Sequence, residues 1–166
     1  MKSDGRLGAD QLAAYFTMME VGSLLQQAVA KQLRDEGDLS PIQFQILAGL
    51  DAAPDSAQRM TDIADRIVYS RSGFTYQAGQ LEQRGLITRA PAQDDERSTV
   101  VRLTADGRAL LRQVMPGHVE LVKELVFDGM PAADLAALQQ VLGPVRDRLR
   151  QAPPRSARPR TRRGSG

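Results

Sequence analysis

Polar side chains rich in hydrogen-bond donors and acceptors share one face of a short predicted helix near the middle of the chain. Residues 60–86, MTDIADRIVYSRSGFTYQAGQLEQRGL, have the pattern of two helices joined by a tight turn, with Ser70 at the N-cap of the second helix. Phe74, Ala78 and Leu81 are spaced so that they share its buried face. The opposite face presents Arg71, Ser72, Thr75, Tyr76, Gln77 and Gln80. Such a face at a helix start can hydrogen-bond base edges in a DNA major groove.

An ordinary helical hairpin with a solvated polar face fits the same pattern, so the next segment is informative. Two short strands are predicted, Leu86–Arg89 and Thr99–Leu103, around a polar loop. A β-hairpin directly after a helix pair is the arrangement of a winged helix-turn-helix. In that arrangement the loop can approach the DNA backbone, and Arg97 is suited to enter the minor groove. The plainer alternative is that Arg97 is the solvated partner of Asp95.

Further helices are predicted on both sides of this region. An N-terminal helix runs from about Ala9 to Arg34, with an apolar set broader than one stripe. The next helix begins at Pro41, with Ser40 as its N-cap, and ends before Pro54.

After the hairpin, the stretch ADGRALLRQVMPGHVELVKELVF has helical spacing, and Thr104 stands at its N-cap. Pro116 lies inside this stretch, so we expect a kink or break near Met115.

The C-terminal part is predicted to hold one more helix and a disordered tail. The helix begins at Pro131, and Gly143 and Pro144 should disturb it. From Pro153 onward the chain has no core-forming residues. Residues 151–166 carry five arginines and no acid, a charge of +5. This tail is either an idle solvated extension or a source of non-specific affinity for phosphates.

Composition narrows the class of protein. The chain has 166 residues, 42% of them hydrophobic, which suffices for one domain with a real core. With zero cysteines, disulfides, thiolate metal sites and cysteine redox sensing are excluded. No signal pattern or long apolar run is present, so we expect a cytoplasmic protein without a membrane partner. The net charge of +2 is dominated by the tail: without its five arginines, 17 basic residues face 20 acidic ones, a charge of −3.

Catalytic motifs are not found. The sequence has no phosphate-binding glycine loop, no Gly-x-Ser-x-Gly elbow and no cysteine nucleophile, so we do not expect an enzyme. His118 is the single histidine, so a His-rich zinc site is not expected, although a carboxylate-assisted site stays open. No cofactor or metal is predicted.

The order of these elements resembles the MarR family of bacterial transcriptional regulators. The resemblance covers roughly residues 10–150 and is carried by LSPIQFQILAGL, IADRIVYSRSGFTYQAGQLEQRGLITR, DDERSTVVRLTADGRALL and MPGHVELV. It implies a mainly α fold, a winged helix-turn-helix with a small β-hairpin wing and long N- and C-terminal dimerisation helices. It further implies a homodimer that binds a near-palindromic double-stranded DNA operator and is expected to act as a repressor.

The resemblance also assigns residues. The positions that meet the major groove are Ser70, Arg71, Ser72, Thr75 and Tyr76, and Gln77 lies on the same polar face. In the wing, Arg97 matches the family's arginine that contacts the minor groove, and Asp95 matches the aspartate that holds this arginine in place. Three positions depart from the family pattern: Glu96 replaces a common basic residue, Gly73 a common Ser or Thr, and Tyr76 a frequent Arg. The operator sequence therefore cannot be derived.

Four regions follow from this resemblance. They are a flexible N-terminus (1–8), a dimerisation region (9–36 and 104–150), a DNA-binding region (38–103) and a disordered Arg-rich tail (151–166). Family members often bind a small-molecule effector where the dimerisation region meets the DNA-binding region. The candidates for that site are Tyr15, Met19, Phe44 and His118, each of which also has a plain explanation as a core residue. The alternative function is a helical protein-interaction adaptor without specific DNA binding.

Overall fold

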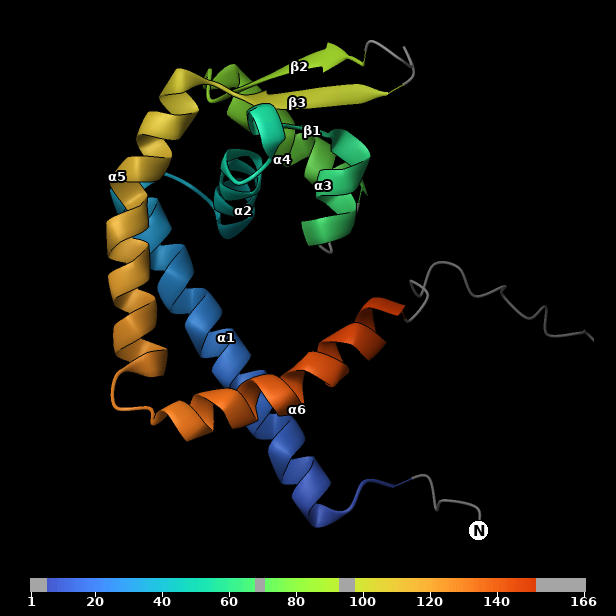
Figure 1. The fold of residues 1–166 in the computed structure, drawn as a ribbon, viewed down its shortest axis with the longest axis vertical. Coiled ribbons are helices and arrows are strands. Elements are labelled where there is room, and N and C mark those ends of the chain that lie inside the picture. The colour runs from blue at the N-terminus through green and yellow to red at the C-terminus, as the bar shows by residue number, and fades with distance from the viewer. Residues whose placement is uncertain (1–5, 68–70, 93–97, 152–166) are drawn as a thin grey trace, which may run out of the picture. The chain divides into compact units, whose positions relative to one another are not determined.

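The computed structural model describes residues 6–67, 71–92 and 98–151, without the side chains of Arg66, Arg71 and Ser72 (Figure 1). These residues form six α-helices and a three-stranded antiparallel sheet. The elements are α1 (Ala9–Gly37), α2 (Pro41–Asp51), β1 (Ala57–Arg59), α3 (Met60–Ile67), α4 (Arg71–Gln83), β2 (Ile87–Pro91), β3 (Thr99–Leu103), α5 (Ala105–Val122) and α6 (Ala132–Gln151). A 3₁₀ turn (Pro54–Ser56) precedes β1, and a π-helical turn (Lys123–Phe127) follows α5.

The chain divides into two compact units, Met1–Leu125 and Val126–Gly166. The first unit holds the helices α1 to α5 and the whole sheet, so α1 and α5 belong to the same unit as the winged helix-turn-helix. The second unit holds α6. Within the described residues, no helix is long and apolar enough to span a bilayer.

The predicted start of α2 is confirmed. The Ser40 side chain accepts a hydrogen bond from the Gln43 N–H at 3.2 Å, and Gln43 Oε1 accepts one from the Ser40 N–H at 3.0 Å. This reciprocal pair satisfies two backbone donors that a helix start leaves without partners. Pro41 occupies the first helical position, where its missing N–H has no consequence.

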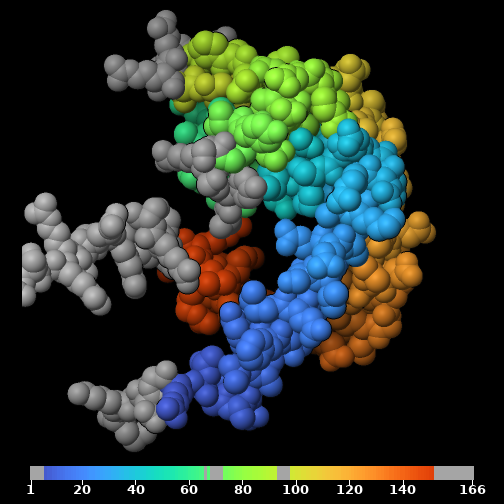
Figure 2. All heavy atoms as spheres, turned by 180° about the vertical axis from the view of Figure 1, so that it is seen from behind, coloured from blue at the N-terminus to red at the C-terminus, as the bar shows by residue number. Residues whose placement is uncertain are grey.

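The core of the first unit lies among α2, α3, α4, the sheet, the first turns of α5 and the C-terminal end of α1. Its fully or nearly fully buried members include Leu33, Ile46, Leu47, Leu50, Ile63, Phe74, Leu81, Ile87, Val101 and Val114. Of α1, only the last turns contribute to this core, and Leu33 is its one buried residue. The views from the front and from behind show α5 running alongside that part of α1 (Figures 1 and 2).

The sheet has one strand more than the sequence predicts. The two predicted hairpin strands are present as β2 and β3, and β1 pairs with the other edge of β3 to give the order β1–β3–β2. In this register, Val101 of the central strand β3 pairs with Gln58 of β1 on one side and with Arg89 of β2 on the other. Since β1 directly precedes α3, this pairing fixes the start of the helix-turn-helix against the base of the hairpin.

Two expected helix interruptions are absent. Thr104 caps α5 as predicted, its side chain accepting from the Gly107 N–H at 3.0 Å, but α5 continues through Pro116 to Val122. The predicted break near Met115 was therefore wrong. An internal proline removes one backbone hydrogen bond and crowds the carbonyl four residues earlier, but contacts with α1 stabilise the preceding turn: Gln113 Nε2 donates to the Glu36 carbonyl at 2.7 Å.

The last helix also continues where the sequence suggested a disturbance. Its first residue is Ala132, one residue after the predicted start, and it passes through Gly143 and Pro144 to Gln151 without an interruption. Here too the hydrogen bonds of the neighbouring residues on either side of the proline do not depend on its missing N–H.

Candidate nucleic-acid interface

The buried side of α4 is as predicted. Phe74 is 1% exposed, and Ala78 and Leu81 are fully buried. They pack in the same core as Ile63 and Ala64 of α3, so the two helices of the helix-turn-helix have a common apolar interface. Because one side of α4 is fixed in this way, the residues on its other side have defined positions.

Arg71 and Ser72 lie in the first turn of α4, whereas Ser70 lies outside the described residues. Thr75 is exposed, and Tyr76 is 65% exposed. Gln77 is half-buried, and its Oε1 atom is 3.5 Å from the donating Ser40 hydroxyl of α2. Thus Thr75 and Tyr76 lie on the exposed side of α4, while Gln77 is turned toward α2.

The C-terminal end of α4 leads directly into the wing. Gly85 has a φ of 71°, a left-handed conformation that glycine adopts without strain. The Leu86 N–H donates to the Leu81 carbonyl at 3.0 Å and the Gly85 N–H donates to the Glu82 carbonyl at 2.9 Å. This is the Schellman pattern of a helix end, with Gly85 in the position that favours glycine.

An ion pair that the sequence analysis missed joins α4 to β2. Glu82 accepts from Arg89 Nη2 at 2.5 Å and Nε at 2.8 Å, and from the Arg89 backbone N–H at 3.2 Å. The hydrogen bonds and the positive charge of Arg89 hold the pKa of the Glu82 carboxyl below its usual value of 4.5, against a smaller opposing effect of burial. Arg89 is thereby committed to positioning the wing.

The described part of the wing hairpin extends to the residues that flank its loop. Its last strand pair is Pro91 opposite Thr99, beyond which the Ala92 N–H donates to the Ser98 carbonyl at 2.8 Å. Arg59 of β1 donates to the Ser98 hydroxyl at 3.1 Å, a neighbour that the sequence analysis did not anticipate. Asp95 and Arg97, the two predicted wing residues, lie outside the described residues.

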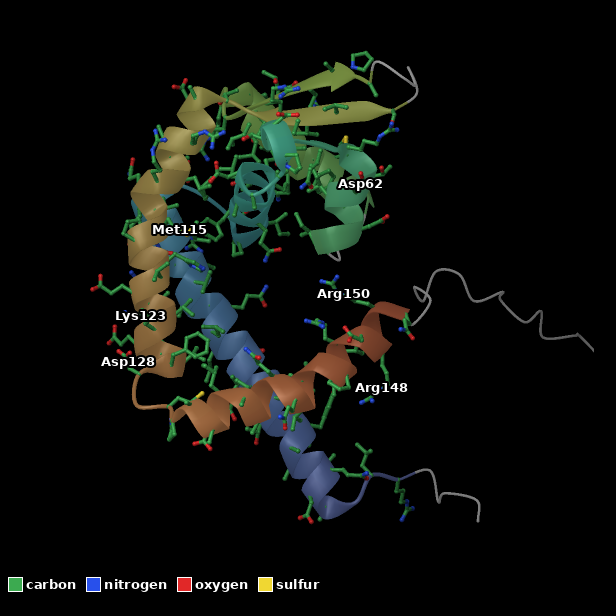
Figure 3. The ribbon with its side chains drawn as sticks, viewed as in Figure 1. Asp62, Met115, Lys123, Asp128, Arg148 and Arg150 are labelled. Atoms are coloured by element: carbon green, nitrogen blue, oxygen red, sulfur yellow. The ribbon has the colours of Figure 1, made fainter. Side chains whose placement is uncertain are left out.

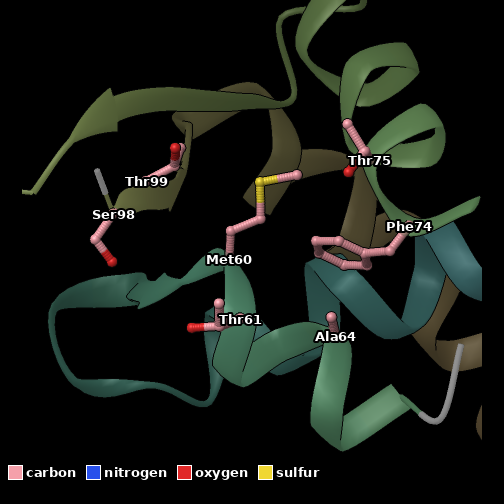
Figure 4. Close-up of a pocket in the computed structure, with 7 residues that line it drawn as sticks. All are labelled: Met60, Thr61, Ala64, Phe74, Thr75, Ser98 and Thr99. Carbon is pink, nitrogen blue, oxygen red and sulfur yellow. The ribbon is translucent and has the colours of Figure 1, made fainter. Parts of the chain in front are cut away.

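A pocket of about 230 Å³ lies between the helix pair and the base of the wing (Figure 4). Its lining comes from α3, α4 and the segment around the start of β3, and consists of Met60, Thr61, Ala64, Phe74, Thr75, Ser98 and Thr99. The apolar part is bordered by four hydroxyl groups. Since Thr75 both lines this pocket and is exposed on α4, the helix face and the wing base form one surface.

Two of the four candidate effector residues are brought together. Phe44 of α2 is buried, and its ring lies 4.6 Å from that of His118 of α5 between centroids. Burial lowers the pKa of His118 below 6.5, and its Nδ1 atom is buried with no partner among the described residues. Tyr15 and Met19 lie on the exposed N-terminal half of α1, at 46% and 50% exposure, away from this pair.

Within the described ranges, no group of three or more His, Asp or Glu side chains is placed to hold an ion.

This geometry defines the class of protein. A helix pair with a common core, a second helix with an exposed polar side, and an antiparallel hairpin directly after it constitute a winged helix-turn-helix. Residues 37–98 match the model of the MarR family. The HTH-type transcriptional regulator PecS of Dickeya dadantii (strain 3937) is 30% identical over 122 residues, which cover 72% of each chain.

Solved structures agree. The fold is similar to that of Sco3205, a MarR family transcriptional regulator from Streptomyces coelicolor in complex with DNA, with a TM-score of 0.86, 26% identity and coverage of 92% of this chain and 94% of that one. AbsC, a MarR family regulator from the same organism, gives a TM-score of 0.84 and 28% identity over 89% of this chain and 99% of its own. The chain belongs to the MarR family of transcriptional regulators, which confirms the predicted family and fold class.

Proposed function

We propose that this regulator binds a near-palindromic DNA operator as a homodimer, with α4 of each subunit in the major groove. The observation that carries the proposal is the two-sided character of α4. Phe74, Ala78 and Leu81 fix one side in the core, while Thr75 and Tyr76 are exposed on the other. A helix of this kind can enter a groove without disturbing its own packing.

The contacts to bases are assigned to the first half of α4. Ser70, Arg71, Ser72, Thr75 and Tyr76 are the proposed set, with Gln77 at its edge because it is half-buried beside Ser40. In the wing, we assign the minor-groove contact to Arg97 and its brace to Asp95, since the hairpin that carries them directly follows α4.

A second copy of the chain is the proposed partner of the exposed apolar residues. On α1 they include Leu12, Tyr15, Phe16, Met18, Met19, Val21 and Leu24, and on α6 Leu135, Leu138, Val141, Leu142 and Leu149. One recognition helix reads only a few base pairs, so discrimination requires two half-sites. A two-fold dimer would hold them about 34–36 Å apart, one helical turn. A single-chain mass by light scattering at micromolar concentration would contradict the dimer.

We also propose that the protein represses transcription and that a small molecule controls its binding to DNA. Occupation of a promoter-proximal operator excludes polymerase, so repression is the expected outcome, and we expect no catalysis. For an effector, the unpartnered Nδ1 atom of His118 beside the Phe44 ring offers one acceptor or donor next to an aromatic surface. Tyr15 and Met19 would join such a site only from the dimer partner.

Selection from genomic DNA tests the proposal. Fragments bound by the wild-type dimer are sequenced, and Arg97→Ala, Tyr76→Ala and Gln83→Ala are measured on the selected duplex. Gln83 is an exposed residue at the far end of α4 and serves as the matched control. We expect enrichment of inverted repeats, affinity losses of about 1–3 kcal/mol for a lost base contact, and little change for Gln83→Ala.

No enrichment of any fragment, even at low salt, would contradict sequence-specific binding. A helical adaptor would give that result, since its Arg side chains would contact protein instead. Operator binding, in contrast, must weaken steeply with added salt, because each neutralised phosphate contributes about −0.9 to the slope of log K against log salt.

A further inference from the structure

Basic side chains are concentrated at the end of α6 and beyond it. Residues 146–163 contain a single acid, Asp147, and eight arginines: Arg146, Arg148, Arg150, Arg155, Arg158, Arg160, Arg162 and Arg163. The segment therefore has a charge of +7. In α6, the Arg146 guanidinium lies 2.8 Å from the Asp147 carboxylate. Arg148 and Arg150 are exposed and project from opposite sides of the last turn (Figure 3).

The remainder of the chain is negative, although the proposed ligand is a polyanion. Of the 22 basic and 20 acidic residues, 14 and 19 lie in residues 1–145, a charge of −5. The DNA-binding part itself, residues 57–103, holds seven arginines against six acids, so its charge is +1. A surface so close to neutrality gives little long-range attraction toward DNA.

Several arginines of residues 57–103 are also engaged within the protein. Arg89 pairs with Glu82, as described above. Arg84 donates to the carbonyls of Asp38 and Gly37 at 2.6 and 3.0 Å. Arg102 donates to the Asp55 carbonyl at 2.8 Å. These guanidinium groups position α4 and the sheet, so they contribute less to phosphate binding than their number suggests.

Helix electrostatics accounts for only a part of the C-terminal charge. Cations in the last turn of a helix complement its dipole, which explains Arg148 and Arg150. The effect falls off within that turn. It gives no reason for the five arginines of residues 152–163, which follow α6 in the sequence.

We propose that residues 146–163 are a basic arm that binds the phosphate backbone of duplex DNA beside the operator, without reading its sequence. The proposal rests on the DNA-binding function proposed above. Arginine presents a planar fork of donors that matches phosphate oxygens, so it suits this contact better than lysine does. Residues 152–166 can span at most roughly 50 Å when fully extended.

The composition of the arm favours duplex DNA over other polyanions. Residues 146–166 contain no aromatic side chain, so they cannot stack on the bases of single-stranded nucleic acid. Leu149 is their one large apolar residue, too little for the apolar face of a membrane-surface helix. What remains is a series of guanidinium groups separated by small residues and prolines, which is suited to contacts with a regular array of phosphates.

Two full-length variants test the arm. In the first, Arg155, Arg158, Arg160, Arg162 and Arg163 are all replaced by Gln, which removes the charge and keeps the length. The second, matched control keeps the composition of residues 152–166 and permutes their order. Both keep α6, and thermal unfolding of each should match the wild type. Affinity is measured by fluorescence anisotropy over a salt series on the selected operator with long flanks, on its minimal form and on a random duplex.

If two to four arginines per subunit contact phosphates, the neutralised variant has a salt slope smaller by about 2–4 per subunit on long duplexes. Between about 50 and 200 mM salt, wild-type affinity then falls about 10-fold to 150-fold more per subunit than that of the variant. We expect a similar loss on operator and random duplexes, a smaller one on the minimal operator, and wild-type behaviour from the permuted arm.

Three results would overturn the arm: an unchanged slope on long duplexes, a loss confined to the operator, or a loss caused by permutation alone. Arm-dependent binding to single-stranded RNA or to anionic vesicles, with none to duplex DNA, would overturn it as well. Failure of the proposed function looks different, because neither wild type nor the neutralised variant would then enrich any genomic fragment.

Discussion

The first turn of α5 offers a sharp test of the packing that supports the DNA-binding surface. A Cβ atom on Gly107 would lie 2.1 Å from the Leu86 carbonyl oxygen and 2.8 Å from Leu103 Cδ1. The same Leu86 oxygen accepts the Thr104 N–H at 3.2 Å. Gly107→Ala therefore has to move the backbone at the point where the end of α4, the start of β2 and α5 meet.

The size of the effect follows from which atom must move. Overpacking in a well-packed region costs about 1–3 kcal/mol, and a backbone oxygen yields less readily than a flexible side chain. Alanine recovers about 1 kcal/mol of helix propensity relative to glycine. We expect a net loss of about 2 kcal/mol in the free energy of unfolding, or a Tm lower by roughly 4–8 °C for a chain of this size.

Gly79 of α4 provides the matched control, since a Cβ atom there meets nothing within 4 Å. Gly79→Ala should raise the free energy of unfolding by about 0.5–1 kcal/mol. Both variants are unfolded with urea at equal subunit concentration, because the stability of a dimer depends on concentration. A Gly107→Ala midpoint equal to or above that of wild type would refute the close approach of α5 to Leu86.

Three further predictions concern single side chains. Phe74→Ala should lower the free energy of unfolding by about 3–5 kcal/mol, measured by urea titration, because a large buried ring is lost. Arg89 lowers the pKa of Glu82 in the folded state, so their pairing stabilises the fold at pH values above the unfolded-state pKa of 4.5. This stabilisation is lost as the pH falls through the folded-state pKa. Glu82→Gln should therefore reduce the difference between urea midpoints measured at pH about 6 and about 3. Burial lowers the pKa of His118, so stability should fall as pH drops from 6.5 toward its folded-state value, and His118→Gln should flatten the slope.

Local interactions explain what the sequence predicted well. Ser40 and Thr104 act through hydrogen bonds to residues close to them in the sequence, and both have their expected N-cap roles. The apolar spacing of Phe74 and Leu81 likewise depends only on helix geometry. Such features can be predicted because the partners are fixed by their distance along the chain.

The features that were missed depend on distant parts of the chain. β1 has three residues, without an alternating pattern, and forms because β3 supplies its hydrogen bonds. Because β1 was not predicted, the position of Arg59 beside the wing could not be predicted either. The Glu82–Arg89 pair crosses from a helix to a strand, so no helical spacing reveals it. The continuation of α5 through Pro116 also depends on packing against α1.

The candidate effector residues show how helix length limits an inference from residue type. Tyr15 precedes Gln32 by 17 residues, and Gln32 is where α1 contacts α5, through the Val114 carbonyl at 3.2 Å. At about 1.5 Å per residue, Tyr15 is roughly 25 Å further along the helix. Within one chain it therefore cannot lie beside His118, which follows Val114 by one turn, and a shared site requires a second subunit.

The structure separates two demands on the arginines of this protein. In residues 57–103, Arg84, Arg89 and Arg102 hold the helices and the sheet in place, and the described exposed residues of α4 (Thr75, Tyr76 and Gln83) are uncharged. Uncharged groups can hydrogen-bond base edges and phosphates, but they neutralise no phosphate charge and so add little long-range attraction. In the basic-arm proposal, residues 146–163 supply most of the sequence-independent attraction, in addition to the proposed contacts of Arg71 and Arg97. Sequence discrimination is then expected to depend on α4 and the wing more than on the arm.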